Sequence, residues 1–448
     1  MMKPEKTIRI GSGAGYSGDR IEPAVDLIKE GNLDYIVFEC LAERTIALAQ
    51  LQKMKDPILG YDPLLEDRMR ACLPLCVSNR VKLISNMGAA NPVAAARKTA
   101  ALAKELGLKK IKIAAVYGDD VKSLLDDTPY TFMESKDSIL SVADEIISAN
   151  AYLGVEGILM ALQQGADIIL TGRVADPSLF LAPLVHEFGW SLESYPLLGK
   201  GTVLGHLLEC AGQVCGGYFA DGVKKHVPDL GNLGFPIAEI TADGSFYISK
   251  LKDSGGMVTT GTCKEQLLYE VHNPSEYLTP DVVADFSGIS FQELDKDVVA
   301  VTGATGRVLT GKLKVSVGYR DGYMADAQLS YGGSYALERS RLAMEIMEER
   351  IRGKHSEPED ILFDLIGIDS LFKGVTTNAD PQEIRLRLAA KTRTREAAVK
   401  LVNELETLYT NGPAAGGGVS KSVSEIIAIQ SILIDKDKVA PKVEYFKS

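Results

Sequence analysis

Short apolar runs alternate with helical patterns from residue 7 to residue 171, and this alternation limits the fold more than any other feature of the sequence. The apolar runs cover residues 7–11, 34–39, 81–85, 111–117 and 167–171. The helical patterns cover residues 23–30, 43–54, 65–77, 93–106 and 155–165. Short apolar strands separated by helices are typical of a parallel sheet that helices bury on both faces. We therefore predict an α/β fold with a mainly parallel sheet, and a ligand site beyond the carboxyl ends of its strands.

The pattern changes after about residue 200. The segment at residues 240–248 predicts a β-hairpin that turns at Asp243-Gly244, because these residues tolerate a positive φ. A second hairpin is predicted at residues 312–331, with its turn at residues 320–322, and residues 383–392 alternate with the period of a strand. Helical patterns follow at residues 335–352 and 394–409. We therefore predict two domains, an α/β domain (1–200) with the ligand site and an α+β domain (201–448) with a largely antiparallel sheet.

Composition and charge argue against several classes of partner. The net charge is −11 over 448 residues, and Lys and Arg are scattered, so the field of the protein would repel nucleic acid and anionic membranes. Apolar runs stay shorter than the roughly 18–20 residues of a membrane span. The N-terminal segment lacks the apolar stretch of a secretory signal, and the six cysteines lack C-x-x-C spacing. We expect no nucleic-acid partner, no membrane association, reduced thiols and a cytoplasmic location.

The first predicted strand is followed at once by the segment GSGAGYSGDR, residues 11–20. Within it, GAGYSG fits the G-x-G-x-x-G pattern of a dinucleotide-binding turn, and Glu39 ends the second strand where an acid would bind a ribose. In that fold the helix begins within the glycine motif, so that its N-terminal N–H groups meet the pyrophosphate. Pro23 favours a helix that begins at residue 23, because proline fits the first turn and breaks a helix further in. The spacing therefore favours a loop that serves another ligand.

This loop places functional groups at the mouth of the predicted sheet. Gly13 and Gly15 allow the backbone to approach a ligand closely. Asp19 supplies a carboxylate and Arg20 a guanidinium. We expect Gly13, Gly15 and Arg20 to bind a substrate anion and Asp19 to act as a general acid or base. The alternative is an internal ion pair that only ties the loop down.

Charged and amide side chains also follow the other predicted strands. Arg44 and Arg173 could clamp a carboxylate or phosphate through paired N–H bonds. Glu39 and Asp176 are candidates for a general acid or base. No redox cofactor is required; Asp19, Glu39 or Asp176 could hold a divalent metal, although nothing in the spacing requires one. For each residue taken alone, a structural role is the alternative.

Two asparagines follow the third predicted strand and are candidate substrate ligands, Asn86 and Asn91. Asn91 is also placed to cap the helix that Pro92 would start. Further along, a glycine-rich loop at residues 410–423 includes Gly416 and Gly417. Its backbone N–H groups could cradle a phosphate, although the loop lacks the P-loop pattern.

A third candidate group lies at residues 205–221, where His206, Glu209 and Cys210 fall within five positions. On a helix, His206 and Cys210 would share a face at i and i+4. That arrangement would suit a cysteine nucleophile with a histidine base. A zinc site is a second interpretation, but the spacing matches no zinc pattern. A buried cysteine beside an ordinary histidine is the structural alternative.

Taken together, several segments of the chain resemble the acyclic terpene utilisation (AtuA-type) family. They are GSGAGYSGDR, DYIVFECLAERT, ISNMGAANP, ADIILTGRVADPSLFLAPL, HLLECAGQVCGG, QLLYEVHNPSEYLTPDVVADF and LYTNGPAAGGG. The likeness spans nearly the whole chain in the right order. The family is named after gene clusters that degrade branched terpenoids as acyl-CoA thioesters. The resemblance implies a role in the catabolism of acyclic terpenes or related organic acids.

The residues and the resemblance together favour a lyase. We expect it to act on a small carboxylic acid or a branched acyl-CoA thioester, by hydration, dehydration or carbon–carbon cleavage. Such chemistry removes a proton next to a carbonyl group and stabilises an enolate, which requires an acid–base pair and oxyanion donors. Two alternatives are a dinucleotide-dependent oxidoreductase that uses GAGYSG and Glu39, and a non-catalytic binding subunit of a partner enzyme. We also expect a homo-oligomer.

Overall fold

The computed structural model describes residues 6–125, 129–354, 358–372 and 381–448. These residues form two compact units. The first unit contains the chain up to Gly318 together with Ile429–Ser448, and the second contains Tyr319–Ala428. The predicted boundary near residue 200 does not coincide with this division, because the chain between residues 201 and 318 continues the sheet of the first unit.

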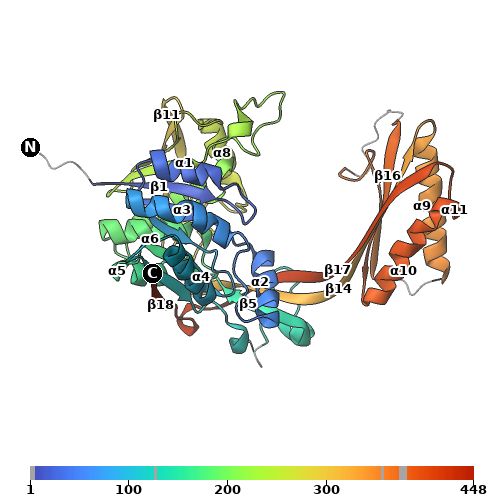
Figure 1. The fold of residues 1–448 in the computed structure, drawn as a ribbon, viewed down its shortest axis with the longest axis horizontal. Coiled ribbons are helices and arrows are strands. Elements are labelled where there is room, and N and C mark those ends of the chain that lie inside the picture. Colours follow the sequence, from blue (N-terminus) through green and yellow to red (C-terminus); the bar gives the residue numbers. More distant parts are fainter. Residues whose placement is uncertain (1–5, 126–128, 355–357, 373–380) are drawn as a thin grey trace, which may run out of the picture. The chain divides into compact units, whose positions relative to one another are not determined.

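Parallel strands form the centre of the large sheet in the first unit (Figure 1). In spatial order they are β1 (Thr7–Ala14), β2 (Tyr35–Phe38), β3 (Lys82–Ser85), β6 (Ile168–Thr171) and β4 (Lys112–Tyr117). Each of these strands was predicted from its apolar run. Tyr35 and Val37 face one hydrophobic core and Ile36 and Phe38 face the other, so β2 is buried on both sides. The continuous apolar run is therefore a consequence of double-sided burial.

Antiparallel strands extend this sheet on both sides. Beyond β1 lie β7 (Pro236–Thr241), β8 (Phe246–Lys250), β12 (Val298–Thr302) and β11 (Ser290–Asp295), and beyond β4 lies β18 (Lys442–Lys447). The predicted hairpin at Asp243-Gly244 is confirmed as the β7–β8 turn, where Gly244 has φ +78°. Hairpins and parallel strands therefore belong to one sheet, and the change of pattern near residue 200 marks a change of strand direction.

Helices cover both faces of this sheet. One face packs against α1 (Glu22–Glu30), α3 (Leu65–Asn79) and α4 (Pro92–Glu105), and the other against α5 (Glu156–Gln163), α6 (Asp176–Phe188) and α7 (Tyr195–Glu209). The first unit also contains α2 (Glu43–Lys55), β5 (Ile146–Ala151) and α8 (Thr260–Leu268). In the described part of the chain, no helix is both long and apolar enough to cross a membrane.

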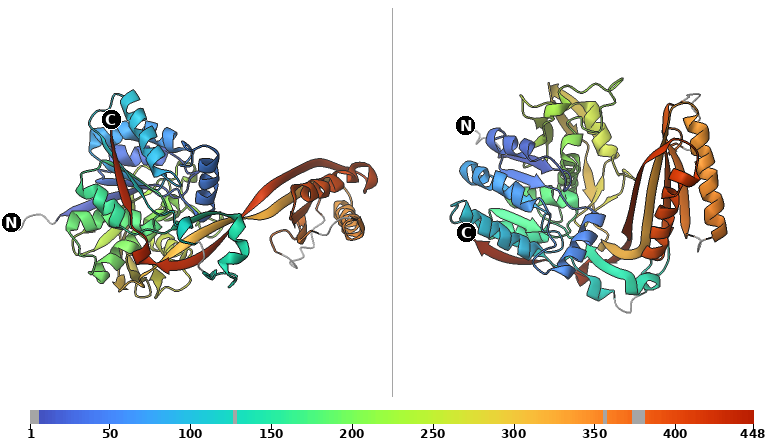
Figure 2. Two further views of the ribbon diagram at one scale, coloured as in Figure 1. Left: turned by 90° about the horizontal axis from the view of Figure 1, so that it is seen from below. Right: turned by 45° about the vertical axis from the view of Figure 1, so that its right-hand side comes forward.

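The second unit is built on a sheet with the strand order β15 (Asp360–Ile366), β16 (Glu383–Thr392), β14 (Lys312–Gly332) and β17 (Gly416–Asp435). β16 runs antiparallel to both of its neighbours. Helices α9 (Ala336–Lys354) and α10 (Arg395–Glu406), with the short α11 (Leu408–Asn411), lie against one face (Figure 2). This face buries Leu329, Leu386 and Leu401. The predicted fold class, a helix-covered mainly parallel sheet followed by an antiparallel one, is confirmed.

Two local predictions in the second half of the chain were wrong. The segment around residues 320–322 does not turn, because β14 continues through it as one strand from Lys312 to Gly332. Its part from Tyr323 onward pairs with β16, so long-range pairing prevails over the local Asp-Gly turn signal. Gly416 and Gly417 lie in strand β17 and not in a loop. Gly322 keeps a left-handed backbone, with φ +83°, within β14.

Replacing Gly322 by Ala should destabilise the second unit by about 1–3 kcal/mol, because a side chain is strained at this φ. A Cβ at this position would also lie 2.3 Å from the carbonyl oxygen of Thr392. Gly417→Ala is the matched control in β17, because its Cβ would meet nothing within 4 Å. Chemical denaturation of the two variants measures the difference. Equal stability of the two variants would contradict the strained conformation.

Candidate functional site

The loops after β2 and β3 meet at the carboxyl end of the sheet. Asn86 donates from Nδ2 to Glu39 Oε1 at 2.8 Å, and its Oδ1 accepts the backbone N–H of Cys40 at 2.7 Å. Glu39 Oε1 also accepts the backbone N–H of Leu41 at 2.9 Å. Glu39 and Asn86 are both buried. The predicted convergence of these two loops is therefore present, with Asn86 fixing the position of Glu39.

Arg173, which follows β6, is the buried cation of this site, with 1% of the residue exposed. Its guanidinium donates to the carbonyl oxygen of Leu41 and to the carboxylate of Asp176, at the start of α6. The guanidinium also lies over the ring of Tyr152, 4.1 Å from the centroid. The backbone N–H of Arg173 donates to the buried Asp119 at 3.0 Å. The arginine thus joins the loops after β2, β4, β5 and β6.

The carboxyl groups around Arg173 have very different proton affinities. Burial raises the pKa of Asp176 to about 8; the nearby carboxylates Glu39 and Glu43 add to the rise and Arg173 opposes it. Burial also raises the pKa of Glu39, against the effect of Arg173. For Glu43, burial is outweighed by Arg173, the Tyr152 hydroxyl and Lys314, which lower its pKa to about 2. The site therefore holds the ionised carboxylate of Glu43 beside Asp176, whose carboxyl keeps its proton up to about pH 8.

His206 pairs with Glu209 at the end of α7. Its Nδ1 lies 2.8 Å from Glu209 Oε1, and its Nε2 lies 3.1 Å from the carbonyl oxygen of Leu267. A carbonyl oxygen can only accept, so Nε2 carries a proton and Nδ1 shares another with Glu209. Burial raises the pKa of Glu209 to about 7. Burial lowers the pKa of His206, but Glu209 and the backbone hydrogen bonds to Leu267 and Gln266 together outweigh it, so the pKa of His206 is raised. The pair exchanges one proton with solvent near neutral pH.

The expected cysteine–histidine pair is absent from this arrangement. α7 ends at Glu209, so Cys210 is the residue that caps the helix and does not share the face of His206. Both nitrogens of His206 already face other groups. Burial raises the pKa of the Cys210 thiol, with the charges of Glu209 and Glu39 adding to the rise. The thiol is therefore protonated, which does not suit a nucleophile.

The glycines of GAGYSG are explained by packing within the protein. A Cβ on Gly13 would lie 2.6 Å from the ring of Phe38, and a Cβ on Gly15 would lie 2.5 Å from the backbone of Cys210. α1 begins at Glu22, with Pro23 in its first turn, as the sequence predicted. The absence of a side chain at Gly13 and Gly15 is thus required by packing against Phe38 and Cys210, and it does not by itself indicate the close approach of a ligand.

Asp19 and the buried Arg68 hold the glycine loop in place. Asp19 accepts the backbone N–H groups of Gly15 and Arg20, each at 2.9 Å. Arg68, on α3, donates to the carbonyl oxygens of Ser17 at 2.8 Å and of Asp19 at 3.1 Å. Both sets of contacts hold the loop in place, as expected if its charged residues have a structural role. Asp19 does so by accepting backbone N–H groups and not by forming an ion pair with Arg20.

A pocket of about 380 Å³ lies beside this loop. Its polar lining includes Gly15, Asp19, Arg20 and Cys210, and its apolar lining includes Tyr16, Tyr218, Leu233, Phe235 and Tyr269. The side chain of Arg20 is 45% exposed. Cys210, which follows Glu209 directly at the end of α7, is the residue that links this pocket to the chain of the carboxyl cluster.

Some predicted site residues lie outside this group. Arg44 is exposed on α2. Asn91 caps α4 by accepting the N–H of Ala94 at 3.3 Å, and its amide donates to backbone oxygens of the preceding loop. Gly416 and Gly417 belong to the second unit. Asn91 thus has the structural role that its capping position predicted.

Three residues without a predicted site role also lie here. Arg68 holds the glycine loop, Tyr152 packs on Arg173, and Tyr277 packs on His206 with ring centroids 5.2 Å apart. Arg68 carries a signal, because it falls at helical spacing within the apolar stripe that includes Met69 and Cys72. Tyr152 and Tyr277 reach the site through contacts between distant segments, so local patterns could not reveal them.

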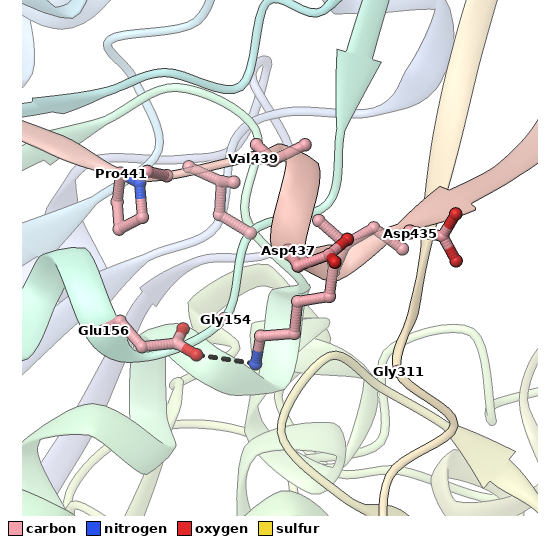
Figure 3. Close-up of a pocket in the computed structure, with 11 residues that line it drawn as sticks. Gly154, Glu156, Gly311, Asp435, Asp437, Val439 and Pro441 are labelled. Carbon is pink, nitrogen blue, oxygen red and sulfur yellow. Dashed lines mark ion pairs between the residues drawn. The ribbon is translucent and has the colours of Figure 1, made fainter.

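A second pocket, of about 610 Å³, lies elsewhere in the first unit (Figure 3). Its lining includes Leu153, Gly311 and Val439. Lys436 lies 2.6 Å from Glu156 and donates to the carbonyl oxygen of Pro280 at 2.8 Å, so its charge is compensated within the protein. None of the site residues predicted from the sequence lines this pocket.

The described residues contain no group of three or more His, Cys, Asp and Glu side chains arranged to hold a metal ion. The structure therefore adds no further metal ligands to Asp19, Glu39 and Asp176, the carboxylates that the sequence analysis named as possible ligands of a divalent metal.

The comparison with known families covers almost the whole chain. The model of the acyclic terpene utilisation family protein AtuA matches residues 8–445. The chain belongs to this family. Membership implies a role in acyclic terpene utilisation and confirms the resemblance seen in the sequence. No curated protein and no solved structure matches the chain.

The His206–Glu209 pair should make the protein less stable as the pH rises through neutrality. The native state keeps a proton on Glu209 up to about pH 7, whereas an unfolded chain loses it near 4.5, so stability falls across this window. The raised pKa of His206 acts in the same direction. Glu209→Gln should flatten the dependence of the free energy of unfolding on pH, measured by denaturation at pH 5, 6 and 7. Glu193→Gln, at an exposed position, should keep the wild-type slope, and equal slopes for all three proteins would refute the assignment.

Proposed function

We propose that the protein is a lyase of acyclic terpene utilisation that acts on a small carboxylic acid or a branched acyl-CoA thioester. The reaction adds or removes water, or cleaves a carbon–carbon bond, next to a carbonyl group. One observation carries this proposal: around Arg173, the pKa of Asp176 is raised to about 8 and that of Glu209 to about 7. Groups that gain and lose a proton near neutral pH are what general acid–base catalysis requires.

Asp176 is the best placed of these carboxyls to meet a substrate. Its side chain is 34% exposed, whereas that of Glu209 is 11% exposed and Glu39 is buried. It starts α6, and its carboxylate is held by Arg173, which fixes its direction. We assign Asp176 the transfer of the proton next to the carbonyl group. Glu39 and Glu43 add to the rise in its pKa.

The two arginines of the site have different roles in this proposal. Arg173 is buried and bonded to Leu41 and Asp176, so it positions Asp176. Arg20 is half exposed and lines the pocket, where its guanidinium can pair with a carboxylate or a phosphate of CoA. The apolar lining, with Tyr16, Leu233 and Phe235, suits a branched hydrocarbon chain.

Tyr277 supports the enolate chemistry of this proposal. Burial holds the pKa of its phenol well above the usual range, and the charges of Glu209 and Asp176 add to the rise. The phenol therefore stays protonated and can donate a hydrogen bond to a developing enolate oxygen. A dinucleotide-dependent oxidoreductase has less support, because the glycines of GAGYSG pack against Phe38 and Cys210.

Asp176→Asn should lower kcat by about 100-fold or more, because an amide cannot accept the proton. The assay follows branched 2-enoyl-CoA and 3-hydroxyacyl-CoA thioesters in D₂O, with deuterium uptake at the carbon next to the carbonyl measured by NMR. Asp437→Asn, in the second pocket, is the matched control and should retain activity. An Asp176→Asn variant that is folded by circular dichroism and exchanges deuterium at the wild-type rate would exclude Asp176 as the acid–base group.

Arg20→Ala should raise KM about tenfold and leave kcat nearly unchanged, because a charged hydrogen bond to the substrate is lost. The fold should survive, since the exposed pair of Arg20 with Glu22, 3.8 Å apart, contributes at most about 1 kcal/mol. Arg44→Ala tests the other exposed arginine that the sequence nominated and should leave KM unchanged. A separate binding measurement tests the alternative: saturable binding of NAD(P) at micromolar concentration would favour the oxidoreductase instead.

A further inference from the structure

The second unit ends in a long strand with no further described strand at its outer edge, and in this strand the backbone N–H of Val419 donates to the Tyr409 hydroxyl at 3.1 Å. β17 is the last strand in the order of its sheet, and among the described residues no strand lies beyond it. Within the second unit this edge covers residues 416–428. Such an edge presents a row of backbone N–H and C=O groups that can pair with another strand. Residues 419–427 include several β-branched residues, which favour a strand.

The sequence of this edge is complementary to itself. In a two-fold antiparallel pair, directly opposite residues lie on the same face, so their numbers differ by an even number. With Val423 opposite its own copy, Lys421 lies opposite Glu425, and this pair occurs twice. The same register places Ser422 opposite Ser424 and Val419 opposite Ile427. It is the register that brings the opposite charges of this segment together.

The side chains are arranged as this register requires. Val419 and Val423 pack against the core of the second unit, so alternate residues of β17 share the helix-covered face. Lys421 lies on the same face, where it contacts Asn403 of α10 at 2.8 Å. The side chains of Lys421 and Glu425 are 35% and 39% exposed, so each can meet a further partner. Their pairs within the chain are Lys421 with Glu406 and Glu425 with Arg320.

The outer strands of the other sheet edges lack this property. β11 and β15 contain acidic residues and no Lys or Arg. In β18, the two-fold register that pairs opposite charges places Lys442 opposite Glu444. That register is centred at the beginning of the strand and leaves Phe446 and Lys447 without partners. Charge complementarity therefore selects β17 among these edges.

We propose that two copies of this chain associate through the outer edge of β17, with Val423 on the two-fold axis. The two sheets then form one continuous antiparallel sheet, and the two Lys421–Glu425 pairs fix its register. This interface goes beyond the proposed lyase activity and does not depend on it.

Charge reversal tests the interface. Lys421→Glu places two acids opposite each other and Glu425→Lys places two bases opposite each other, so each variant alone should be a monomer of 48.3 kDa by sedimentation velocity. Mixing the two variants restores both opposite-charge pairs, so the mixture should form heterodimers. Glu406→Gln removes the pair of Lys421 within the chain and should remain a dimer, like the wild type. A monomeric wild type at tens of micromolar, dimeric single variants, or a mixture that stays monomeric would each overturn the proposal.

A cysteine crosslink tests the register without changing a charge. Val423→Cys places two thiols opposite each other on the axis, within the distance that a disulfide spans. Oxidation should therefore give a covalent dimer on non-reducing electrophoresis. Val419→Cys is the matched control, because position 419 faces position 427 of the other copy, roughly 26 Å along the strand from its own copy. Equal crosslinking of the two variants, or none in Val423→Cys, would refute this register.

Discussion

Burying a guanidinium is costly unless its charge and its N–H groups are compensated, and the candidate site is organised around this requirement. Arg173 meets it with the carboxylate of Asp176, the carbonyl oxygen of Leu41 and the face of Tyr152. These partners come from different loops at the carboxyl end of the sheet, so the arginine determines how close these loops lie. The carboxyls that surround it share a poorly solvated environment, and this environment raises the pKa of Asp176.

A second buried arginine, Arg68, determines the position of the glycine loop. Arg68 donates to the carbonyl oxygens of Ser17 and Asp19 and so ties the loop to α3. The loop can then pass close to Cys210, a contact that only a glycine at position 15 permits. A motif typical of nucleotide binding is thus used here to bring two segments of the chain together. The pocket beside the loop exists because this contact holds the Arg20 side of the loop against the end of α7.

The sequence revealed the parts of the fold that depend on local patterns. Strands buried on both faces must be apolar throughout, so the five parallel strands could be located within a few residues. The pairing of His206 could not be settled in this way, because Glu209 and Cys210 both lie within one turn, and the end of α7 decides between them. The course of β14 depends on β16, much later in the chain, and this pairing prevails over a local turn signal. The convergence of Glu39, Asn86 and Arg173 followed from topology, whereas Tyr277 lies in a segment that carries the family resemblance but gave no sign of a contact with His206.

The distribution of charge also indicates how a substrate would lie in the proposed reaction. The ionised Glu43 makes the interior of the site unfavourable for an anionic group, and Arg173 is already bonded to Leu41 and Asp176. The exposed guanidinium at the pocket is that of Arg20, so the charged end of a substrate belongs at the outer side, next to the glycine loop. In the proposed reaction, its reacting carbon is the end that meets Asp176. Glu43, which raises the pKa of Asp176, therefore also orients the substrate, because its charge repels the charged end.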